Sequence, residues 1–346
     1  MPPIPVPCDR SRRAAKAHQA SLTKPKGSLG RLESVVEDLA AVQGTRFPEV
    51  RPAEALIFAA DHPVCAHGVA PFPSEVTAAM VRNFASGGAA ASVLCRQLGV
   101  PLHVIDVGVQ APVESGGDAA CIVRVPNIQA GDLSLGQALP GDALPQSLSA
   151  GRDAVDRCGD DTRLLILGEM GIGNSTVAAA LSSALMGFDP DLMVGPGTGA
   201  SGAMLDRKKS VVRAAVQGTK GCDTTEILRA VGGREVAALV GAAQRAAERS
   251  IAVLVDGFIV SAAMLAAVQL DPKVRPYLFF AHRSREPGHG PVLKALSAEP
   301  LMDMGLALGE GSGALTAFPL LEMACRLHRD MATFESASVP TAGGPA

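Results

Sequence analysis

The sequence contains no tryptophan, a single tyrosine (Tyr277) and only 3% aromatic residues. Proteins that hold single-stranded nucleic acid usually offer rows of aromatic side chains for base stacking, and this chain cannot supply them. It also lacks an excess of positive charge, because 31 Lys and Arg residues are balanced by 34 Asp and Glu residues. We therefore expect no nucleic-acid partner.

Long apolar runs are missing as well. No uninterrupted stretch is long enough to cross a bilayer, and the N-terminal segment 1–7 is Pro-rich without an apolar signal core. The seven cysteines form an odd, scattered set with no Cys-x-x-Cys pair. Such a set is typical of reduced thiols, so we expect a cytoplasmic protein with no membrane partner.

The chain has 346 residues, of which 47% are hydrophobic, enough for one large domain and a smaller one. Short β-branched runs alternate with Ala-rich amphipathic stretches, which predicts an α/β protein with a mainly parallel sheet and helices on both faces. The predicted strands are 55–60, 102–107, 121–125, 164–167, 252–255 and 277–281. The predicted helices include 29–42, 75–84, 88–98, 175–186, 204–216, 234–249, 258–268 and 314–328, with Gly- and Pro-rich loops at 108–120 and 126–148.

Four predicted strands end in polar or small residues, at Asp61-His62, Asp106, Gly168-Glu169 and Asp256-Gly257. Ligands of open α/β sheets bind outside the carboxyl ends of the strands, so these ends predict one shared cleft. The alternative at any single end is that Asp or Gly merely stops the strand.

One acid, Glu310, lies among the small residues of segment 309–313, directly after the apolar run 304–308. A ligand can approach a carboxylate beside glycines closely, and at the edge of an apolar run its pKa tends upward, which suits a general base. Glu169 has the same setting in segment 168–173. The alternative for Glu310 alone is a solvated Glu at a helix end.

Two glycine loops favour an anion. Segment 168–176 leads from an apolar strand into a helix, and the free N–H groups at a helix start favour phosphate. The segment is neither a dinucleotide fingerprint, because Thr176 replaces its third Gly, nor a Walker loop, because no Gly-Lys-Ser/Thr follows. The second loop, 195–199, precedes a helix with three consecutive basic residues including Lys208. Two such loops and a cation can enclose one phosphate. The alternative for the first glycine loop is a tight turn between strand and helix, and the alternative for each basic residue is a place on a solvated helix face.

Two further patterns give weaker support, one to a metal site and one to a serine hydrolase. His62, His67, His282 and His289 lack the His-x-x-x-His and His-Glu-x-x-His spacings of a zinc site, so we expect no metal. Ser201 stands in a sequence close to Gly-x-Ser-x-Gly, but Ala occupies the last position. A serine hydrolase is therefore kept only as an alternative function.

The ordered set of these segments resembles the nicotinate-nucleotide–dimethylbenzimidazole phosphoribosyltransferase family. The resemblance covers about residues 20–330 and rests on segments 24–33, 60–62, 168–176, 195–199, 256–258, 284–289 and 309–313. It implies a Rossmann-like large domain at 51–289, a small helical domain made from 1–50 with 290–333, and a homodimer. The polar and small residues of 334–346 predict a disordered tail.

The resemblance also implies a reaction. The ribosyl 5′-phosphate of nicotinate mononucleotide would move to a nitrogen of 5,6-dimethylbenzimidazole, giving nicotinate and α-ribazole 5′-phosphate for the lower ligand of cobalamin. No metal or redox cofactor is implied. Glu310 matches the family's general base, and Glu169 matches a second acid of the site.

Other site residues carry over from the same resemblance. For the nucleotide and its phosphate they are Gly171, Gly173, Asn174, Gly197, Lys208, Asp256, Gly257 and Ser284. For the acceptor base they are Phe72, Met80, Met170 and Leu308, of which Phe72 and Met80 could hold a flat ring by stacking and by sulfur–aromatic contact. The alternative for Met80 is core packing.

The chain departs from the family pattern at two prolines. Pro196 stands where the second glycine loop usually has Arg, and Pro63 stands where Gly usually follows Asp61-His62. Some members also carry polar residues at the positions of Phe72 and Met80, so the preferred acceptor base stays open. A non-catalytic nucleotide sensor on the same scaffold would keep the glycine loops without needing Glu310, and the presence of both acids argues against it.

Chelation provides the first test. Because the histidine spacing fits no zinc site, we expect incubation with a chelator to leave the rate of nicotinate release from nicotinate mononucleotide unchanged. An enzyme that a chelator inhibits and that added metal restores would instead favour the histidine site.

Overall fold

The computed structural model describes residues 2–111, 113, 119–125 and 128–340. In chain order the elements are α1 (Asp9–Ser21), α2 (Arg31–Gln43), β1 (Ala53–Ala59), η1 (Pro63–His67), α3 (Glu75–Ser86), α4 (Ala90–Leu98), β2 (Leu102–Asp106), β3 (Cys121–Arg124), η2 (Leu133–Leu135), α5 (Ala143–Asp156), β4 (Leu164–Met170), α6 (Asn174–Met186), α7 (Pro190–Met193), α8 (Gly202–Gln217), α9 (Thr224–Val231), α10 (Arg234–Glu248), β5 (Ala252–Val255), α11 (Phe258–Leu270), η3 (Pro272–Tyr277), β6 (Leu278–Phe280), α12 (His289–Ala295) and α13 (Ser312–Asp330).

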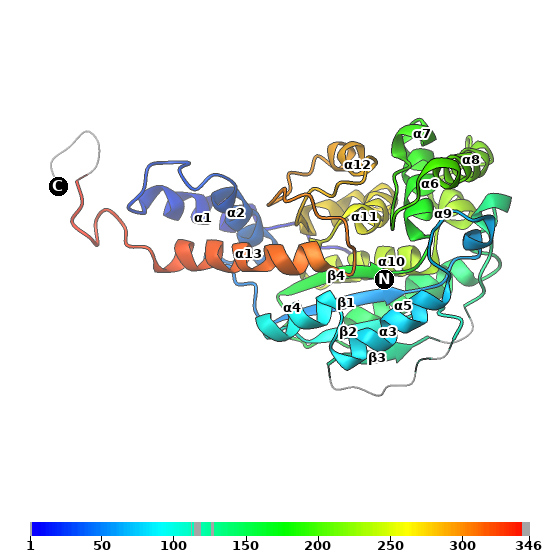
Figure 1. Cartoon of the computed structure of the whole chain (residues 1–346). Helices are drawn as coiled ribbons and strands as arrows, with labels where there is room; N and C mark the ends of the chain where they lie inside the picture. Colours follow the sequence, from blue (N-terminus) through cyan, green and yellow to red (C-terminus); the bar gives the residue numbers. More distant parts are fainter. Residues whose placement is uncertain (1, 112, 114–118, 126–127, 341–346) are drawn as a thin grey trace.

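The described strands form one six-stranded parallel sheet in the order β3-β2-β1-β4-β5-β6 (Figure 1). The order reverses between β1 and β4, which is the topological switch point where doubly wound sheets place their ligand. The register sets Ala59 beside Met170 and Leu167 beside Val255, so the carboxyl ends of the central strands lie at one edge. The α/β prediction with a Rossmann-like parallel sheet is confirmed.

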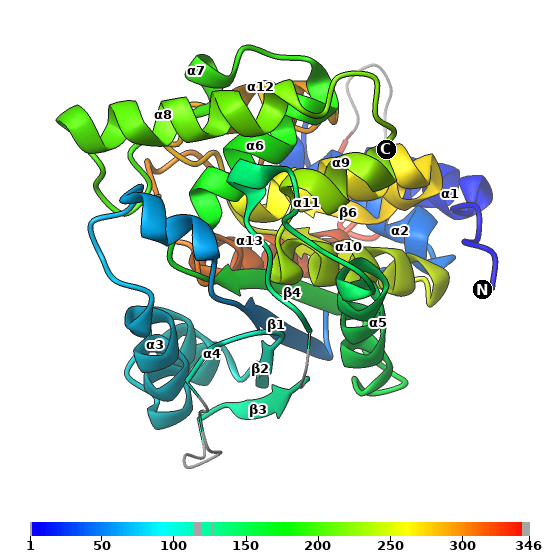
Figure 2. The ribbon, with the colours of Figure 1, turned by 90° about the vertical axis from the view of Figure 1, so that its right-hand side faces the viewer.

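Helices cover both faces of this sheet, which explains why its central strands are apolar throughout. α10 packs on β1, β4 and β5, and α5 packs against α10. α13 and α4 pack on the opposite face, against β4 and β2 respectively (Figure 2). Every residue of β4 and β5 is buried between these layers.

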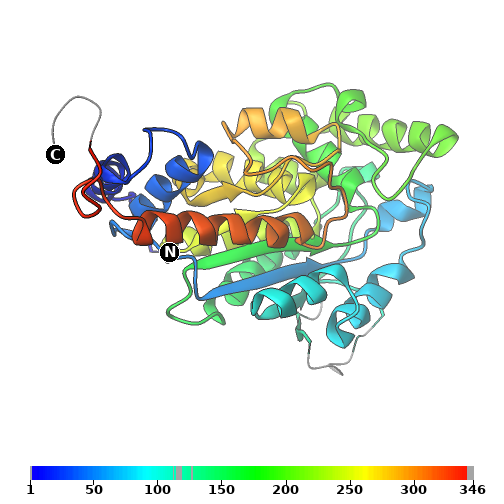
Figure 3. The same cartoon turned by 60° about the vertical axis from the view of Figure 1, so that its left-hand side comes forward.

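The two ends of the chain meet beside the sheet. α13 starts against β4 and β5 and runs on to α2, which also packs against α1 (Figure 3). The buried ring of His328 near the end of α13 is hydrogen-bonded to Gln19 of α1, at 2.9 Å, and to the carbonyl of Arg46, at 2.8 Å. One continuous helix therefore joins the group formed by α1 and α2 to the edge of the cleft.

Several local predictions were wrong. Segment 126–148 contains the start of α5 at Ala143 rather than loop throughout, and α7 and α9 were not predicted. Pro145 and Gly151 gave α5 the composition of a loop, but Pro145 lies in its first turn, where the missing N–H is tolerated. α9 has a capping box of Asp223 and Glu226, a sequence signal that identifies its start.

Some predictions fall partly outside the described residues. The predicted loops include 112, 114–118 and 126–127, and the predicted tail includes 341–346, none of which is described. Within the described part of the tail, the Phe334 N–H donates to the Ser21 carbonyl at 2.9 Å. No described helix combines the length and the apolar character needed to cross a bilayer.

The contact between α5 and α10 gives a test of the fold. A Cβ added at Gly151 would lie 1.8 Å from the Ala238 carbonyl oxygen, so Gly151→Ala must push the helices apart. We expect a loss of about 1–3 kcal/mol in the free energy of unfolding, the usual cost of overpacking. The matched control is Gly290→Ala, because a Cβ there meets nothing within 4 Å. Equal urea midpoints for the two variants would contradict this close contact.

Candidate active site

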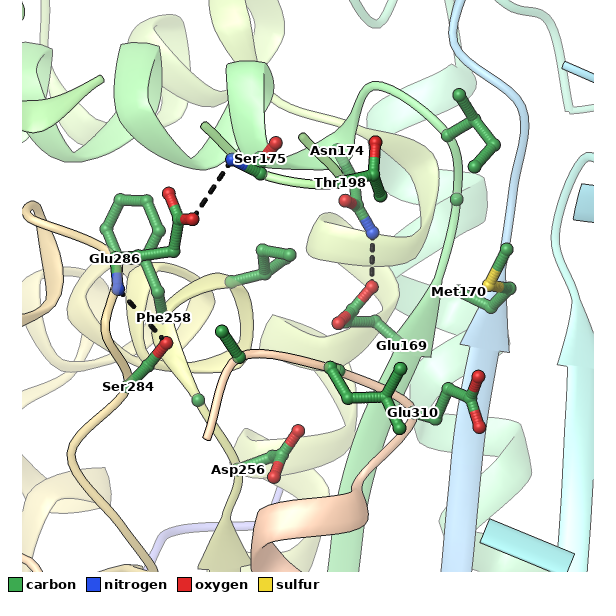
Figure 4. A pocket seen from close by; sticks show the side chains of 18 of the residues that line it. Glu169, Met170, Asn174, Ser175, Thr198, Asp256, Phe258, Ser284, Glu286 and Glu310 are labelled. Carbon is green, nitrogen blue, oxygen red and sulfur yellow. Dashed lines mark hydrogen bonds between the residues drawn. The ribbon is translucent and has the colours of Figure 1, made fainter. Parts of the chain in front are cut away.

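A cleft opens at the carboxyl ends of β4, β5 and β6 (Figure 4). Its walls come from segment 169–175, the loop residues 197–198, segment 256–259 after β5, several residues between 282 and 286, and segment 307–310 before α13. Of the four polar strand ends predicted to share one cleft, those of β4 and β5 line it, whereas Asp61, His62 and Asp106 do not, so the prediction is confirmed only for two of the four ends.

Most of the residues expected in the site line this cleft. They are Glu169, Met170, Gly171, Asn174, Gly197, Asp256, Gly257, Ser284, Leu308 and Glu310. Gly173 and Lys208 lie directly behind the lining, whereas Phe72 and Met80 do not reach it. Phe72 lines a separate cavity next to His62, and Met80 is half-buried against the core.

The two glycine–acid segments pack directly on each other. The Glu310 N–H donates to the Glu169 carbonyl at 3.2 Å, and a Cβ at Gly168 would lie 2.6 Å from the Gly311 nitrogen. A Cβ at Gly309 would lie 2.7 Å from a carboxylate oxygen of Glu169. Glycine is therefore required here for close approach of two backbones, in addition to access for a ligand.

The Glu169 carboxyl is deeply buried in the cleft. Burial raises its pKa well above the usual value, and the nearby carboxylates of Asp256 and Glu235 raise it further. The Asn174 side-chain amide donates to it and acts in the opposite direction. Glu169 is thus held in a fixed orientation by α6 while the surrounding charge disfavours its ionised form.

Glu310 has a strained backbone and a buried side chain. Its φ is 62°, in the left-handed region that costs a non-glycine residue about 1–2 kcal/mol. Burial raises the pKa of its carboxyl, while the N–H groups of Ala91 and Ala90 at the start of α4 lower it. In Figure 4 this carboxyl points away from that of Glu169, and its Oε2 has no hydrogen-bond partner among the described residues.

The start of α6 offers unpaired donors. Gly173 is buried and precedes the helix with a φ of 95°, a conformation that only glycine adopts readily. The N–H groups of Gly173, Ser175 and, in the second glycine loop, Thr198 have no acceptor in the described part of the chain. Free N–H groups converging at a helix start form an anion-binding site.

Lys208 supplies a cation to the same region. Its side chain is only 1% exposed, and its Nζ donates to the Ser175 hydroxyl at 3.0 Å and to the Gly195 carbonyl at 2.9 Å. Burial lowers its pKa to about 8, while the Glu286 carboxylate acts to raise it. An ammonium with three donors and two neutral acceptors can still bind an anion.

Sequence reasoning missed several supporting contacts. Glu286 accepts from the Gly197 N–H at 3.0 Å and so joins the second glycine loop to the segment carrying Ser284. Burial lowers the pKa of His289 to about 3, and its Nδ1 accepts from the Ser284 N–H at 2.9 Å. Glu286 and His289 both lie in segment 284–289, but no spacing rule indicates that Glu286 contacts Gly197, 89 residues away.

The other three histidines considered for a metal site each lie next to one carboxylate. The ring nitrogens of His62, His67 and His282 lie 2.9, 2.8 and 3.5 Å from Glu235, Asp132 and Asp256 respectively. Within the described ranges, no group of three or more His, Cys, Asp or Glu side chains is arranged to hold a metal ion. Ser201 is exposed at the start of α8, outside the cleft lining.

Comparison with known proteins covers nearly the whole chain. A family described as phosphoribosyltransferase matches residues 4–339. The nicotinate-nucleotide–dimethylbenzimidazole phosphoribosyltransferase of Bradyrhizobium sp. (strain BTAi1) is 48% identical over 340 residues, covering 96% of this chain and 95% of that protein. The protein of the same name from Azotobacter vinelandii (strain DJ) is 49% identical, with 97% of each chain covered.

Solved structures agree with these sequence relatives. The crystal structure of nicotinate-nucleotide-dimethylbenzimidazole phosphoribosyltransferase from Thermus thermophilus superposes with a TM-score of 0.90 at 38% identity, covering 97% of this chain and all of that one. The identities, the coverage and the shared architecture lead to one conclusion: the chain belongs to the nicotinate-nucleotide–dimethylbenzimidazole phosphoribosyltransferase family.

Proposed function

We propose that the protein transfers the ribosyl 5′-phosphate of nicotinate mononucleotide to a ring nitrogen of 5,6-dimethylbenzimidazole or a related base. The products are nicotinate and, with dimethylbenzimidazole, α-ribazole 5′-phosphate. One observation carries the proposal beyond family membership. The free N–H groups of Ser175 and Thr198 share one cleft with two buried acids, Glu169 and Glu310.

The donor end of the cleft suits the phosphate. The free N–H groups of Gly173, Ser175 and Thr198 supply neutral donors, and Lys208 behind Ser175 supplies a charge. A phosphate at the start of α6 also interacts favourably with the helix dipole. Asp256, Gly257 and Ser284 line the cleft between this end and Glu310, where the ribose would lie.

The proton balance of the reaction requires one base. Nicotinate leaves the ribose as a pyridine and needs no proton at its ring nitrogen, whereas the benzimidazole must lose its N–H proton as its other nitrogen attacks. Glu310 accepts that proton, and its raised pKa brings it closer to the working pH of a general base. The cationic ring of the bound nucleotide favours the ionised form of Glu169, whose negative charge can then stabilise the positive charge that develops on the ribose.

The acceptor base would bind between Leu308 and α3. Leu308 lines the cleft yet is 61% exposed, so it offers an uncovered apolar wall. α3 approaches from the other side, since its Thr77 hydroxyl accepts from the Ile172 N–H at 3.2 Å. Met80 lies one turn further along α3, and Phe72 precedes the helix with 49% exposure. Both can contact the ring by moving towards Met170 and Leu308.

The wider organisation belongs to the same proposal. We assign residues 51–289 to a large α/β domain and 1–50 with 290–333 to a small helical domain, supported by the packing of α1 and α13 around α2. We assign the protein to the cytoplasm as a homodimer, and the seven free thiols support a reducing compartment.

The decisive assay for the function measures nicotinate release with and without dimethylbenzimidazole. We expect release to require the base and the riboside phosphate to appear in equal amount. A nucleotide sensor would bind nicotinate mononucleotide without releasing nicotinate. Release that ignores the base would indicate hydrolysis instead of transfer.

Replacing Lys208 tests the phosphate site. We expect Lys208→Ala to weaken binding of nicotinate mononucleotide about tenfold or more, because it removes a buried charge, and to leave dimethylbenzimidazole binding nearly unchanged. Since the free ammonium has a pKa of about 8, wild-type affinity for the nucleotide should fall as the pH rises through that value. Titration calorimetry measures both effects, with the half-buried neighbour Lys209→Ala as the control. Equal losses for both substrates would exclude a phosphate role.

Replacing Glu310 tests the general base. We expect Glu310→Gln to keep the urea midpoint and to lower kcat by about 10²–10⁴-fold, the usual contribution of such a group. Because the pKa of Glu310 is raised, wild-type kcat should rise with pH as the carboxyl ionises, and this rise should vanish in the variant. The control is the exposed acid Asp303→Asn. A variant with wild-type kcat would remove Glu310 as the base.

A further inference from the structure

A buried imidazole–carboxylate pair lies directly behind the donor end of the cleft without lining it. The Nε2 of His62, after β1, lies 2.9 Å from the Oε1 of Glu235 in the first turn of α10, and the side chains are 6% and 0% exposed. Among the described residues, neither oxygen of Glu235 nor the Nε2 of His62 has a hydrogen-bond partner of good geometry, so the close contact between the two side chains is the main polar contact of each. A buried carboxylate with one counter-group is costly, and truncating either partner usually destabilises a protein strongly.

The imidazole fits a slot between two glycines. A Cβ at Gly171 would lie 3.1 Å from the Nε2 of His62, and a Cβ at Gly233 would lie 2.9 Å from its Cε1. Gly173 is also near, with a Cβ position 3.4 Å from the Cβ of His62. The ring therefore supports the backbone from which the free Gly173 N–H projects, and a shift of the ring moves that donor.

The carboxylate of Glu235 also acts on the charge of the cleft. It is one of the groups that raise the pKa of Glu169, together with Asp256 and Glu310 from the elements on the other side. Next to Glu235, the Arg234 guanidinium donates to the carbonyls of Asp61 and Ile128. The carboxylates of Asp61 and Asp106 act to raise the pKa of this guanidinium. Arg234, Asp61 and Asp106 are therefore the other charged groups around the His62–Glu235 pair.

We propose that His62 and Glu235 are a positioning pair for the reaction, in which the imidazole holds the Gly171–Gly173 backbone in place for the donor phosphate and the carboxylate sets the charge balance behind Glu169. The proposal rests on the function proposed above. Neither residue touches the substrate, and both act through groups that do.

Glu235→Gln separates charge from shape, because Gln keeps the size of the side chain and can still contact His62. Removing the negative charge lowers the pKa of Glu169, so its ionised form persists to lower pH. The acidic limb of kcat/KM for nicotinate mononucleotide should therefore move to lower pH. The control variant is Asp132→Asn, which alters the exposed His67–Asp132 pair, and the acidic limb of its kcat/KM profile should lie at the same pH as in the wild type.

His62→Ala and His62→Gln test the support of the loop. We expect KM for nicotinate mononucleotide to rise about tenfold or more and KM for dimethylbenzimidazole to change by less than about twofold, because small displacements of binding groups are costly. His67→Ala is the matched control. If His62→Ala does not fold, His62→Gln and Glu235→Gln carry the test, with urea midpoints measured for all variants.

The outcomes separate the two proposals. A wild-type protein that releases no nicotinate defeats the proposed function. An active wild type whose Glu235→Gln variant keeps both its acidic limb and its KM values, with only a lower urea midpoint, shows a purely structural pair and overturns the positioning role. The positioning role is supported if the acidic limb of kcat/KM moves to lower pH in Glu235→Gln and if the His62 variants raise KM for nicotinate mononucleotide selectively.

Discussion

The packing of segment 309–311 on segment 168–169 is the contact on which the site depends. It is a contact of backbone on backbone, with the Glu310 N–H on the Glu169 carbonyl and Gly168 against Gly311. Any side chain at Gly168 would separate β4 from the start of α13. Asp256 reinforces the contact by accepting from the Ala314 N–H at 2.9 Å, which fixes the first turn of α13 to the end of β5. The strained φ of Glu310 is maintained because these neighbours determine its position.

This arrangement gives the cleft two electrostatic ends. Glu169, Asp256 and Glu310 concentrate negative charge at one end, and their mutual repulsion is part of the reason that the pKa values of Glu169 and Glu310 are raised. Lys208 and the free N–H groups make the other end attractive to anions. Nicotinate mononucleotide has a positively charged ring nitrogen, on a ring that also bears a carboxylate, and a phosphate at its other end. In the proposed binding mode the ring nitrogen faces the acids and the phosphate faces Lys208, which would align the glycosidic bond with the acids.

The sequence predicted the parts of the site that are carried by single segments. Apolar runs ending in Asp, Glu or Gly predicted the strands and, at β4 and β5, the edge where the cleft opens, and the first glycine loop predicted free N–H groups at the start of α6. What it could not predict is which loops lie opposite each other. The contact of Glu286 with Gly197 joins residues 89 positions apart, and that of His62 with Glu235 joins β1 to α10. Such contacts follow from strand order, which no local pattern specifies. Phe72 and Met80 belong to a segment that approaches the cleft without lining it.

The two prolines that depart from the family pattern are accommodated by local geometry. Pro63 is the first residue of η1, where no backbone N–H is needed, so it can replace Gly without loss of a hydrogen bond. Pro196 opens a turn in which its carbonyl accepts from the N–H groups of Gly199 and Ala200, at 3.0 and 2.8 Å. The proline therefore stiffens the second glycine loop while removing the cationic side chain that the family pattern has there. In the proposed phosphate site, recognition would then depend more on oriented N–H groups and on Lys208, whose buried position keeps its charge close to the loop.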